Sequence, residues 1–180
     1  MVTIDLITGF LGSGKTTFLK KYAEYLMDQG LHIGILENDF GAINVDMLML
    51  HELRGDQCEL EMIAGGCDAE SHRRRFRTKL ISMRMCGYDR VLVEPSGIYD
   101  VDEFFDVLRE EPLDQWYEIG NVIAILDARL ENNLSQQADY LLASEAANAG
   151  KVILSHADAA TREQCEDTVA HLNRALEQLR

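Results

Sequence analysis

The sequence predicts an α/β fold of three layers, in which a mostly parallel β-sheet carries helices on both faces. Three observations predict it. Strand-like apolar segments alternate with segments of helical periodicity along all 180 residues, which is typical of a parallel sheet with helical crossovers. Residues 122–126 are continuously apolar, as expected for a strand buried on both faces. A glycine-rich loop joins the first strand to the first helix.

The first elements can be assigned in chain order. Residues 2–8 are largely apolar with several β-branched positions, and they form a strand that enters the glycine loop. Apolar residues recur at helical spacing over 18–26, and Gly30 ends that helix. The apolar run 31–36 predicts the second strand, and the short run 60–63 predicts the third.

The remaining elements continue the alternation. Their helices carry apolar residues three to four positions apart, whereas their strands are short continuous apolar runs. In order, we expect a helix at 70–85, a strand at 90–93, a helix at 101–108, a strand at 122–126, a helix at 140–147, a strand at 151–154 and a last helix over 165–179.

Composition limits the classes of protein to which the chain can belong. Its length predicts a single domain over residues 1–180, and 47% hydrophobic residues suffice for a core. The net charge of −14 argues against a nucleic-acid partner, which requires clustered Lys and Arg. We find neither a signal peptide nor a membrane span. The four cysteines are scattered along the chain, a pattern typical of reduced thiols in a cytoplasmic protein. The sequence ends on a predicted helix, which suggests that it is a piece of a longer chain.

The glycine loop carries the most specific motif. Residues 9–16 read Gly-Phe-Leu-Gly-Ser-Gly-Lys-Thr and fit G-x-x-x-x-G-K-[ST], the P-loop, so the predicted fold is that of a P-loop NTPase. In such loops the backbone N–H groups face phosphate oxygens. Lys15 would reach the β- and γ-phosphates, and the Thr16 hydroxyl would ligate Mg²⁺. The expected nucleotide-binding residues of this segment are Gly9, Leu11, Gly12, Ser13, Gly14, Lys15, Thr16 and Thr17.

Acidic residues follow two of the predicted strands, on the sheet edge where ligands bind in such folds. Glu37 and Asp39 follow the second strand, and Glu94 follows the fourth strand in the manner of a Walker-B acid. We expect Asp39 and Glu94 to support Mg²⁺ or to orient water, with Lys15 as the third catalytic residue. The alternative for the Glu37 segment is a polar turn.

The sixth strand leads into Ser155-His156-Ala157-Asp158. Guanine-nucleotide proteins often have Asn-Lys-x-Asp at this place, where the aspartate accepts hydrogen bonds from the base. Asp158 would keep that role, His156 could stack on a purine, and Ser155 reaches less far than Asn. The alternative is that Asp158 caps the last helix. GTP is therefore favoured over ATP, and ATP stays open.

A resemblance to a known family rests on these motifs in their order along the chain. The chain resembles the CobW-type P-loop GTPases, relatives of the urease- and hydrogenase-maturation GTPases. The resemblance implies a GTPase that couples hydrolysis to metal delivery, with Mg²⁺, a client metalloprotein as partner, and a further domain that this sequence lacks. The segments that carry it are Gly9–Thr17, Glu37–Gly41, Gly65–Cys67, Glu94–Gly97 and Ser155–Asp158.

One family motif is incomplete in this chain. The family has Cys-x-Cys-Cys after a double glycine and binds Zn²⁺ or a similar metal there, whereas this sequence reads Cys67-Asp68-Ala69-Glu70. Cys67, Glu70 and His72, joined by Glu37, could form a weaker and more oxygen-rich site. The alternative is that Cys67 is a packed thiol and Glu70 an acid in the first turn of a helix.

Two questions stay open from the residues alone. The basic run from His72 to Lys79 either forms a solvated face paired with local acids or docks an acidic partner. The chain either hydrolyses GTP or acts as a nucleotide-gated metal- or partner-binding module with negligible turnover. A small-molecule kinase is a third alternative, but no lid segment is evident.

Overall fold

A computed structural model of the chain describes residues 1–10, 12–39, 45–64, 68–95, 101–131 and 133–179. Six strands form one sheet in the order β3-β2-β4-β1-β5-β6, and every pairing between them is parallel. The α/β prediction is thereby confirmed. The strands are β1 (Val2–Gly9), β2 (Ile33–Asp39), β3 (Cys58–Ala64), β4 (Arg90–Pro95), β5 (Tyr117–Asp127) and β6 (Lys151–Ser155).

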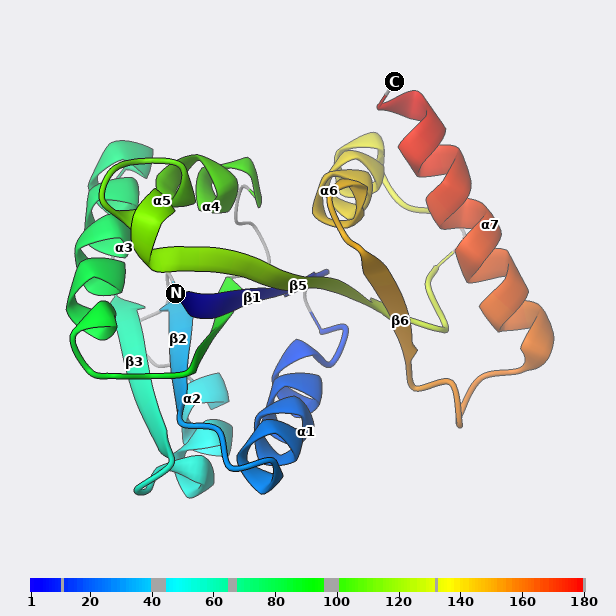
Figure 1. Ribbon diagram of the computed structural model, residues 1–180. Coiled ribbons are helices and arrows are strands. Elements are labelled where there is room, and N and C mark those ends of the chain that lie inside the picture. Colours follow the sequence, from blue (N-terminus) through cyan, green and yellow to red (C-terminus); the bar gives the residue numbers. More distant parts are fainter. Residues whose placement is uncertain (11, 40–44, 65–67, 96–100, 132, 180) are drawn as a thin grey trace.

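Helices cover both faces of this sheet, as the sequence predicted (Figure 1). One face carries α1 and α2, and the other carries α3 to α6, with α7 packed beside α6. None of the described helices is both long and apolar enough to cross a membrane. The helices are α1 (Lys15–Asp28), α2 (Val45–Leu50), the 3₁₀ turn η1 (His51–Leu53), α3 (Ala69–Arg84), α4 (Val101–Leu108), α5 (Leu113–Trp116), α6 (Gln136–Ala147) and α7 (Arg162–Gln178).

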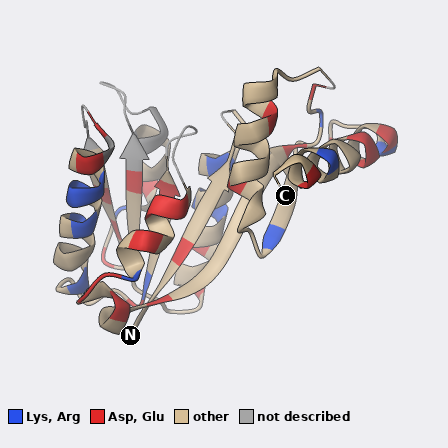
Figure 2. Cartoon of the chain, turned by 90° about the horizontal axis from the view of Figure 1, so that it is seen from above, with Lys and Arg blue, Asp and Glu red and all other residues tan. Residues whose placement is uncertain are grey.

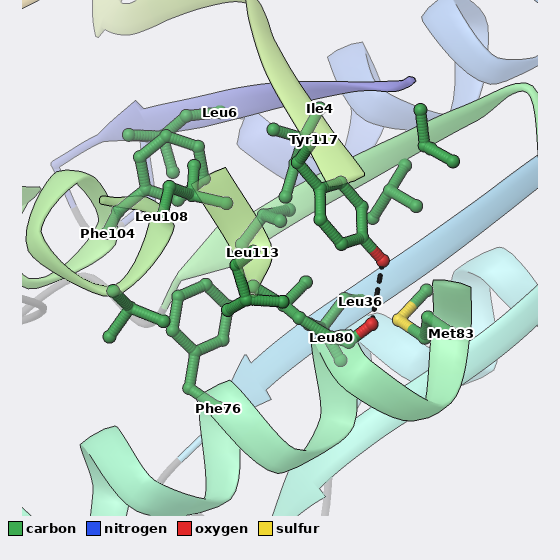
Figure 3. Packing of buried hydrophobic residues seen from close by; sticks show 14 of the residues in the cluster. Ile4, Leu6, Leu36, Phe76, Leu80, Met83, Phe104, Leu108, Leu113 and Tyr117 are labelled. Carbon is green, nitrogen blue, oxygen red and sulfur yellow. Dashed lines mark hydrogen bonds between the residues drawn. The ribbon is translucent and has the colours of Figure 1, made fainter. Parts of the chain in front are cut away.

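The alternation of side chains along the strands produces two cores, one on each face. Leu6 of β1 packs against the α3–α5 side, whereas its neighbour Ile7 packs against α1. In the first core Phe76 of α3 is fully buried near Phe104 of α4, with 6.3 Å between their ring centroids (Figure 3). The Tyr117 hydroxyl in this core donates to the backbone oxygen of Leu80 at 2.8 Å, so its buried polar atom is satisfied.

Several boundaries differ from the sequence prediction for physical reasons. β2 and β4 extend past the apolar runs, so Glu37 and Glu94 lie inside strands rather than in turns after them. β5 begins at residue 117 because its polar early positions still pair with β1. α2, η1 and α5 were not predicted, since helices of three to six residues show too little periodicity to be recognised.

The packing predicts a large effect of truncating Phe76. Phe76→Ala should lower the free energy of unfolding by about 3–5 kcal/mol, because it removes a buried ring and leaves a cavity. Tyr25→Ala is the matched control: this aromatic residue of α1 is 61% exposed, so its loss should change stability by only about 0.5 kcal/mol. Urea denaturation measures both, and equal losses would contradict the assignment of the core.

Candidate functional site

The P-loop begins where β1 comes very close to its neighbour β5. Gly9 ends β1 with φ of +144°, and a Cβ built at this residue would lie 2.2 Å from the backbone oxygen of Ile125. A side chain is therefore excluded at Gly9 on two grounds, the backbone conformation and the lack of space. The chain turns here from the sheet into the loop, and Gly14 with φ of +87° precedes the first residue of α1.

Lys15 lies at the centre of this turn. Its side chain is buried, and Nζ donates to the backbone oxygens of Gly9 at 2.7 Å and of Phe10 at 3.3 Å. The N–H of Ser13 donates to the same Phe10 oxygen at 3.0 Å, which closes the loop. The loop thus wraps around one ammonium group at the start of a helix, an arrangement suited to polyphosphate. Leu11 lies outside the described residues.

A hydroxyl and a carboxylate meet beside Lys15. Thr16 Oγ1 donates to Glu94 Oε1 at 2.8 Å, and both residues are buried. Glu37 of β2 is also buried and pairs in register with Glu94 of β4, on the face that α1 covers. Parallel strands therefore gather two carboxylates and one hydroxyl at the start of α1. Oxygen ligands of this kind are those that Mg²⁺ prefers.

The other residues predicted to bind a metal are not brought together in the described part of the chain. The side chain of Asp39 and the whole of Cys67 lie outside the described residues. Glu70 is exposed in the first turn of α3, and His72 Nδ1 lies 2.8 Å from Glu103 Oε1, so His72 faces α4. Within the described residues no group of three or more His, Cys, Asp or Glu could hold a metal ion.

The end of β6 brings part of the predicted base-reading segment next to the P-loop. A Cβ on Gly14 would lie 3.6 Å from the Cβ of Ser155 and 3.9 Å from Cε1 of His156. Ser155 Oγ donates to the backbone oxygen of Leu126 at 3.1 Å. The exposed His156 ring lies 3.0 Å from Asp127 Oδ2, which fixes its direction, and its φ is +52°. Both residues thus border the loop from the β6 side.

Asp158 does not cap α7, so that interpretation is wrong. The helix begins at Arg162 with Thr161 as its N-cap, because the Thr161 hydroxyl accepts from the N–H of Gln164 at 3.1 Å. The Gln164 side chain accepts in return from the N–H of Thr161 at 2.8 Å, a complete capping box. Asp158 is exposed in the turn before it.

Asp127, the last residue of β5, was not among the residues predicted from the sequence. Its carboxylate accepts from the N–H of Arg129 at 2.8 Å and also contacts His156. Burial disfavours its ionisation, but the hydrogen bonds from Arg129 and His156 outweigh burial and hold the pKa of Asp127 below its usual range. An acid that directly follows the most apolar strand was the available signal, the same one that identified Glu94.

A second residue that the sequence analysis missed lies beneath the loop. Glu145 of α6 is only 4% exposed, accepts from Thr8 Oγ1 at 3.3 Å and accepts from the N–H of Gly9. Burial raises the pKa of Glu145 to about 7, although the charge of Lys15 and these two hydrogen bonds oppose the rise. Nothing in the local sequence distinguishes this glutamate from Asp139, the other acid of its helix.

Comparison with known proteins identifies relatives of the whole described fold. A family model for the CobW/HypB/UreG nucleotide-binding domain matches residues 3–180. Zinc chaperone YjiA of Escherichia coli (strain K12) is 29% identical over 186 residues, covering 96% of this chain and 55% of that protein. Zinc chaperone YeiR of the same strain is 28% identical over 164 residues, which cover 91% of this chain and 49% of YeiR. The chain thus spans about half the length of these relatives.

Solved structures share the fold. Zn(II)-bound YjiA GTPase from E. coli matches with a TM-score of 0.57 and 20% identity, covering 95% of this chain and 54% of that one. The signal recognition particle receptor FtsY from Elizabethkingia anophelis in complex with GDP matches with a TM-score of 0.65 and 20% identity. The match covers 95% of this chain and 54% of the FtsY chain. At such identities the likeness concerns the fold, which agrees with the predicted P-loop class.

The environment of Glu145 predicts a pH-dependent stability. Its carboxyl stays protonated up to about pH 7 when folded but ionises near 4.5 when unfolded, so the free energy of unfolding falls as pH rises between these values. Glu145→Gln lacks this ionisation. Between pH 5.5 and 8 the free energy of unfolding of the original protein should fall by about 2 kcal/mol more than that of the variant, at 1.36 kcal/mol per pKa unit.

Urea denaturation at the two pH values measures this difference. Glu177→Gln, a change at an exposed position of α7, is the matched control and should follow the original protein at both values. Parallel pH profiles for Glu145→Gln and the original protein would contradict a protonated carboxyl beneath the loop.

Proposed function

Because the chain belongs to the CobW/HypB/UreG nucleotide-binding domain family, we propose that it binds GTP with Mg²⁺ and hydrolyses it to GDP and phosphate. We also propose that residues 1–180 form a single nucleotide-binding domain and that this domain acts in the cytoplasm. Hydrolysis would be coupled to delivery of a metal ion to a client metalloprotein, since the E. coli relatives are named zinc chaperones.

One observation carries the nucleotide assignment: the buried hydrogen bond from Thr16 Oγ1 to Glu94 Oε1, one residue after Lys15. A hydroxyl at the start of a helix and an acid on a neighbouring strand are the pair that P-loop enzymes use around Mg²⁺. Ser13 supports the same assignment. Its Oγ is buried without a hydrogen-bond partner among the described residues, and a phosphate oxygen would satisfy it.

The residues of the loop and of the neighbouring strands would have different roles around the nucleotide. Lys15 and the loop N–H groups would stabilise negative charge on the β- and γ-phosphates. Thr16 and Glu94, with Asp39, would hold Mg²⁺, which when bound neutralises phosphate charge. Asp39 and Glu94 are also the candidates for orienting the attacking water, as their chain positions at the ends of β2 and β4 allow. Gly9, Leu11, Gly12, Gly14 and Thr17 complete the proposed phosphate site.

Selection of the base rests on the end of β6. Ser155 and His156 lie next to Gly14, and we propose that His156 stacks on the purine while Asp158 accepts from guanine N–H groups. The capping role that competed for Asp158 belongs to Thr161, which removes one argument against base recognition. ATP remains the alternative substrate because the segment retains only the aspartate of Asn-Lys-x-Asp.

A second candidate function is a nucleotide-gated metal- or partner-binding module with negligible turnover. Two departures from the family pattern make it plausible: the incomplete Cys67-Asp68-Ala69-Glu70 motif, and the Ser155–Asp158 segment, which keeps only the aspartate of Asn-Lys-x-Asp. Cys67 and Glu37 are then the proposed ligands of Zn²⁺ or another transition metal. Single-turnover hydrolysis of GTP, with and without Mg²⁺ and with and without Zn²⁺, separates the two functions. Mg²⁺-dependent release of phosphate supports the hydrolase, whereas tight GTP binding without release supports the module.

Removal of the loop ammonium should abolish turnover. Lys15→Ala is expected to lower the rate of GTP hydrolysis by roughly a hundredfold or more, since it removes a preorganised charge from the phosphates. Lys21→Ala, at an exposed position of the same helix, is the control and should retain the original rate. A phosphate-release assay at saturating GTP measures both, and turnover by Lys15→Ala at the original rate would refute the catalytic assignment.

Loss of the proposed base contact should be selective for GTP. Asp158→Ala is expected to weaken GTP binding by roughly tenfold or more, the effect of losing hydrogen bonds to a charged acceptor, and to leave ATP binding unchanged. Asp167→Ala, an exposed acid of α7, should affect neither nucleotide. Calorimetric titration with each nucleotide in Mg²⁺ is the measurement. Equal weakening of both nucleotides would exclude a base-reading role.

A further inference from the structure

A buried carboxyl lies beneath the start of the P-loop. Glu145 of α6 accepts hydrogen bonds from Thr8 Oγ1 at 3.3 Å and from the N–H of Gly9, and only 4% of the residue is exposed. It reaches this position because α6 packs across β1 and β5. Burial of a carboxyl is costly, since the group loses its contact with water. A buried carboxyl that contacts the loop backbone therefore requires an explanation beyond packing.

The backbone of Gly9 connects Glu145 to the lysine of the loop. The N–H of Gly9 donates to Glu145, whereas its carbonyl oxygen accepts from Lys15 Nζ at 2.7 Å. These bonds restrain the backbone on both sides of the Gly9 Cα, where φ is +144°. Glycine has the widest range of backbone conformations, so a single conformation at this residue depends on outside contacts. Glu145 supplies one of them and thus acts on the loop through the backbone.

Two opposing effects determine the protonation of Glu145. Burial is the larger and raises the pKa of Glu145 to about 7, whereas the charge of Lys15 and the hydrogen bonds from the loop backbone and Thr8 favour the ionised carboxylate. Helix α6 has no Lys or Arg of its own, and Figure 2 shows bands of basic residues on α3, at the margin of the molecule. Within the described part of the chain, the charge that acts on Glu145 is therefore that of Lys15.

The titratable groups of the elements that pack against α6 contact partners other than Glu145. These contacts join Asp5 of β1 to Tyr22, Asp127 of β5 to His156, and His171 of α7 to Asp139. The remaining Asp, Glu, Lys and Arg residues of β5 and α7 are exposed. Just beyond the end of α6, Asp102 of α4 accepts from Asn148 Nδ2 at 3.3 Å. A change of charge at the P-loop is thus the change that Glu145 is placed to respond to.

We propose that Glu145 is a positioning residue of the phosphate site: its protonated carboxyl holds the Gly9 backbone so that the loop and Lys15 face the polyphosphate, and it takes up a proton when the polyphosphate binds. This inference rests on the proposed function, which it extends with a residue outside the P-loop motif and with a dependence of binding on pH.

The direction of the coupling follows from the charges. Without a ligand, the positive charge of Lys15 favours the ionised form of Glu145. Phosphate oxygens beside Lys15 offset that charge and add negative charge, so the neutral form of Glu145 becomes more favourable in the complex. Binding above about pH 7, where the free protein has lost the proton, therefore takes a proton up. Because linkage is reciprocal, the affinity for polyphosphate falls as pH rises through this range.

Comparison with Glu145→Gln tests the coupling. The amide keeps an oxygen that accepts from Gly9 but is neutral at every pH, and titration of the nucleotide itself affects both proteins equally. Calorimetric titration with a non-hydrolysable GTP analogue in Mg²⁺ should give affinities within about twofold of each other at pH 6. Between pH 6 and pH 8.5 the affinity of the original protein should fall by roughly threefold or more relative to that of the variant.

The same titration measures the proton directly. At pH 8, the binding heats in two buffers of different ionisation enthalpy give the number of protons taken up per bound nucleotide. The original protein should take up more protons than Glu145→Gln does. Glu177→Gln, the same change at an exposed position of α7, is the control and should match the original protein.

Removal of the acceptor tests the positioning role. Glu145→Leu keeps the bulk of the side chain but leaves the N–H of Gly9 without its partner, so it should weaken both the GTP analogue and inorganic triphosphate by roughly tenfold or more at pH 6. Because inorganic triphosphate has no base, a loss for both ligands places the effect at the phosphates. Glu145→Gln should retain both affinities, and Glu177→Leu should change neither. If thermal melting shows that Glu145→Leu does not fold, the pH profile of Glu145→Gln decides.

Failure of this inference is distinguishable from failure of the proposed function. Parallel pH profiles and equal proton uptake for the original protein and Glu145→Gln would overturn the inference alone. So would a folded Glu145→Leu variant that binds inorganic triphosphate as the original protein does, since Glu145 would then have only a structural role. An original protein that binds neither the GTP analogue nor inorganic triphosphate at pH 6 would overturn both.

Discussion

The close contact between the end of β1 and β5 determines much of what lies around it. Since a Cβ on Gly9 would overlap the Ile125 carbonyl, this position accepts only glycine, and the chain leaves the sheet there. The peptide groups of Gly9 then serve two buried side chains. Its N–H donates to Glu145 and its carbonyl accepts from Lys15 Nζ. One crowded strand end thus connects the sheet, the α6 carboxyl and the lysine of the loop.

Parallel pairing explains why the other candidate residues meet near this point. In a parallel sheet all strands end at one edge, so β1, β2, β4 and β6 deliver their last residues to the same side. The register that pairs Glu37 with Glu94 also turns both towards α1, where Thr16 donates to Glu94. A site assembled this way needs no long loops. Its carboxylates are held by strands, the most rigid part of the fold.

The sequence predicted the sheet, most helices and the P-loop because these depend on local periodicity and on one specific motif. It could not predict Glu145, whose proximity to Gly9 depends on how α6 packs across β1. It left open whether Asp158 reads a base or caps α7, since Asp and Thr both serve as N-caps and only the backbone path places the cap at Thr161. His72 was expected near Cys67, but its position in the helix turns it towards Glu103.

The proposed function depends on a Mg²⁺-assisted polyphosphate site at the start of α1. Calorimetric titration with a non-hydrolysable GTP analogue, in Mg²⁺ and again in excess chelator, tests it most directly. We expect one saturable binding event per chain whose affinity falls by roughly tenfold or more without Mg²⁺, because the Thr16–Glu94 pair would lose its role around the cation. Absence of binding heat, or equal affinity in both conditions, would contradict it.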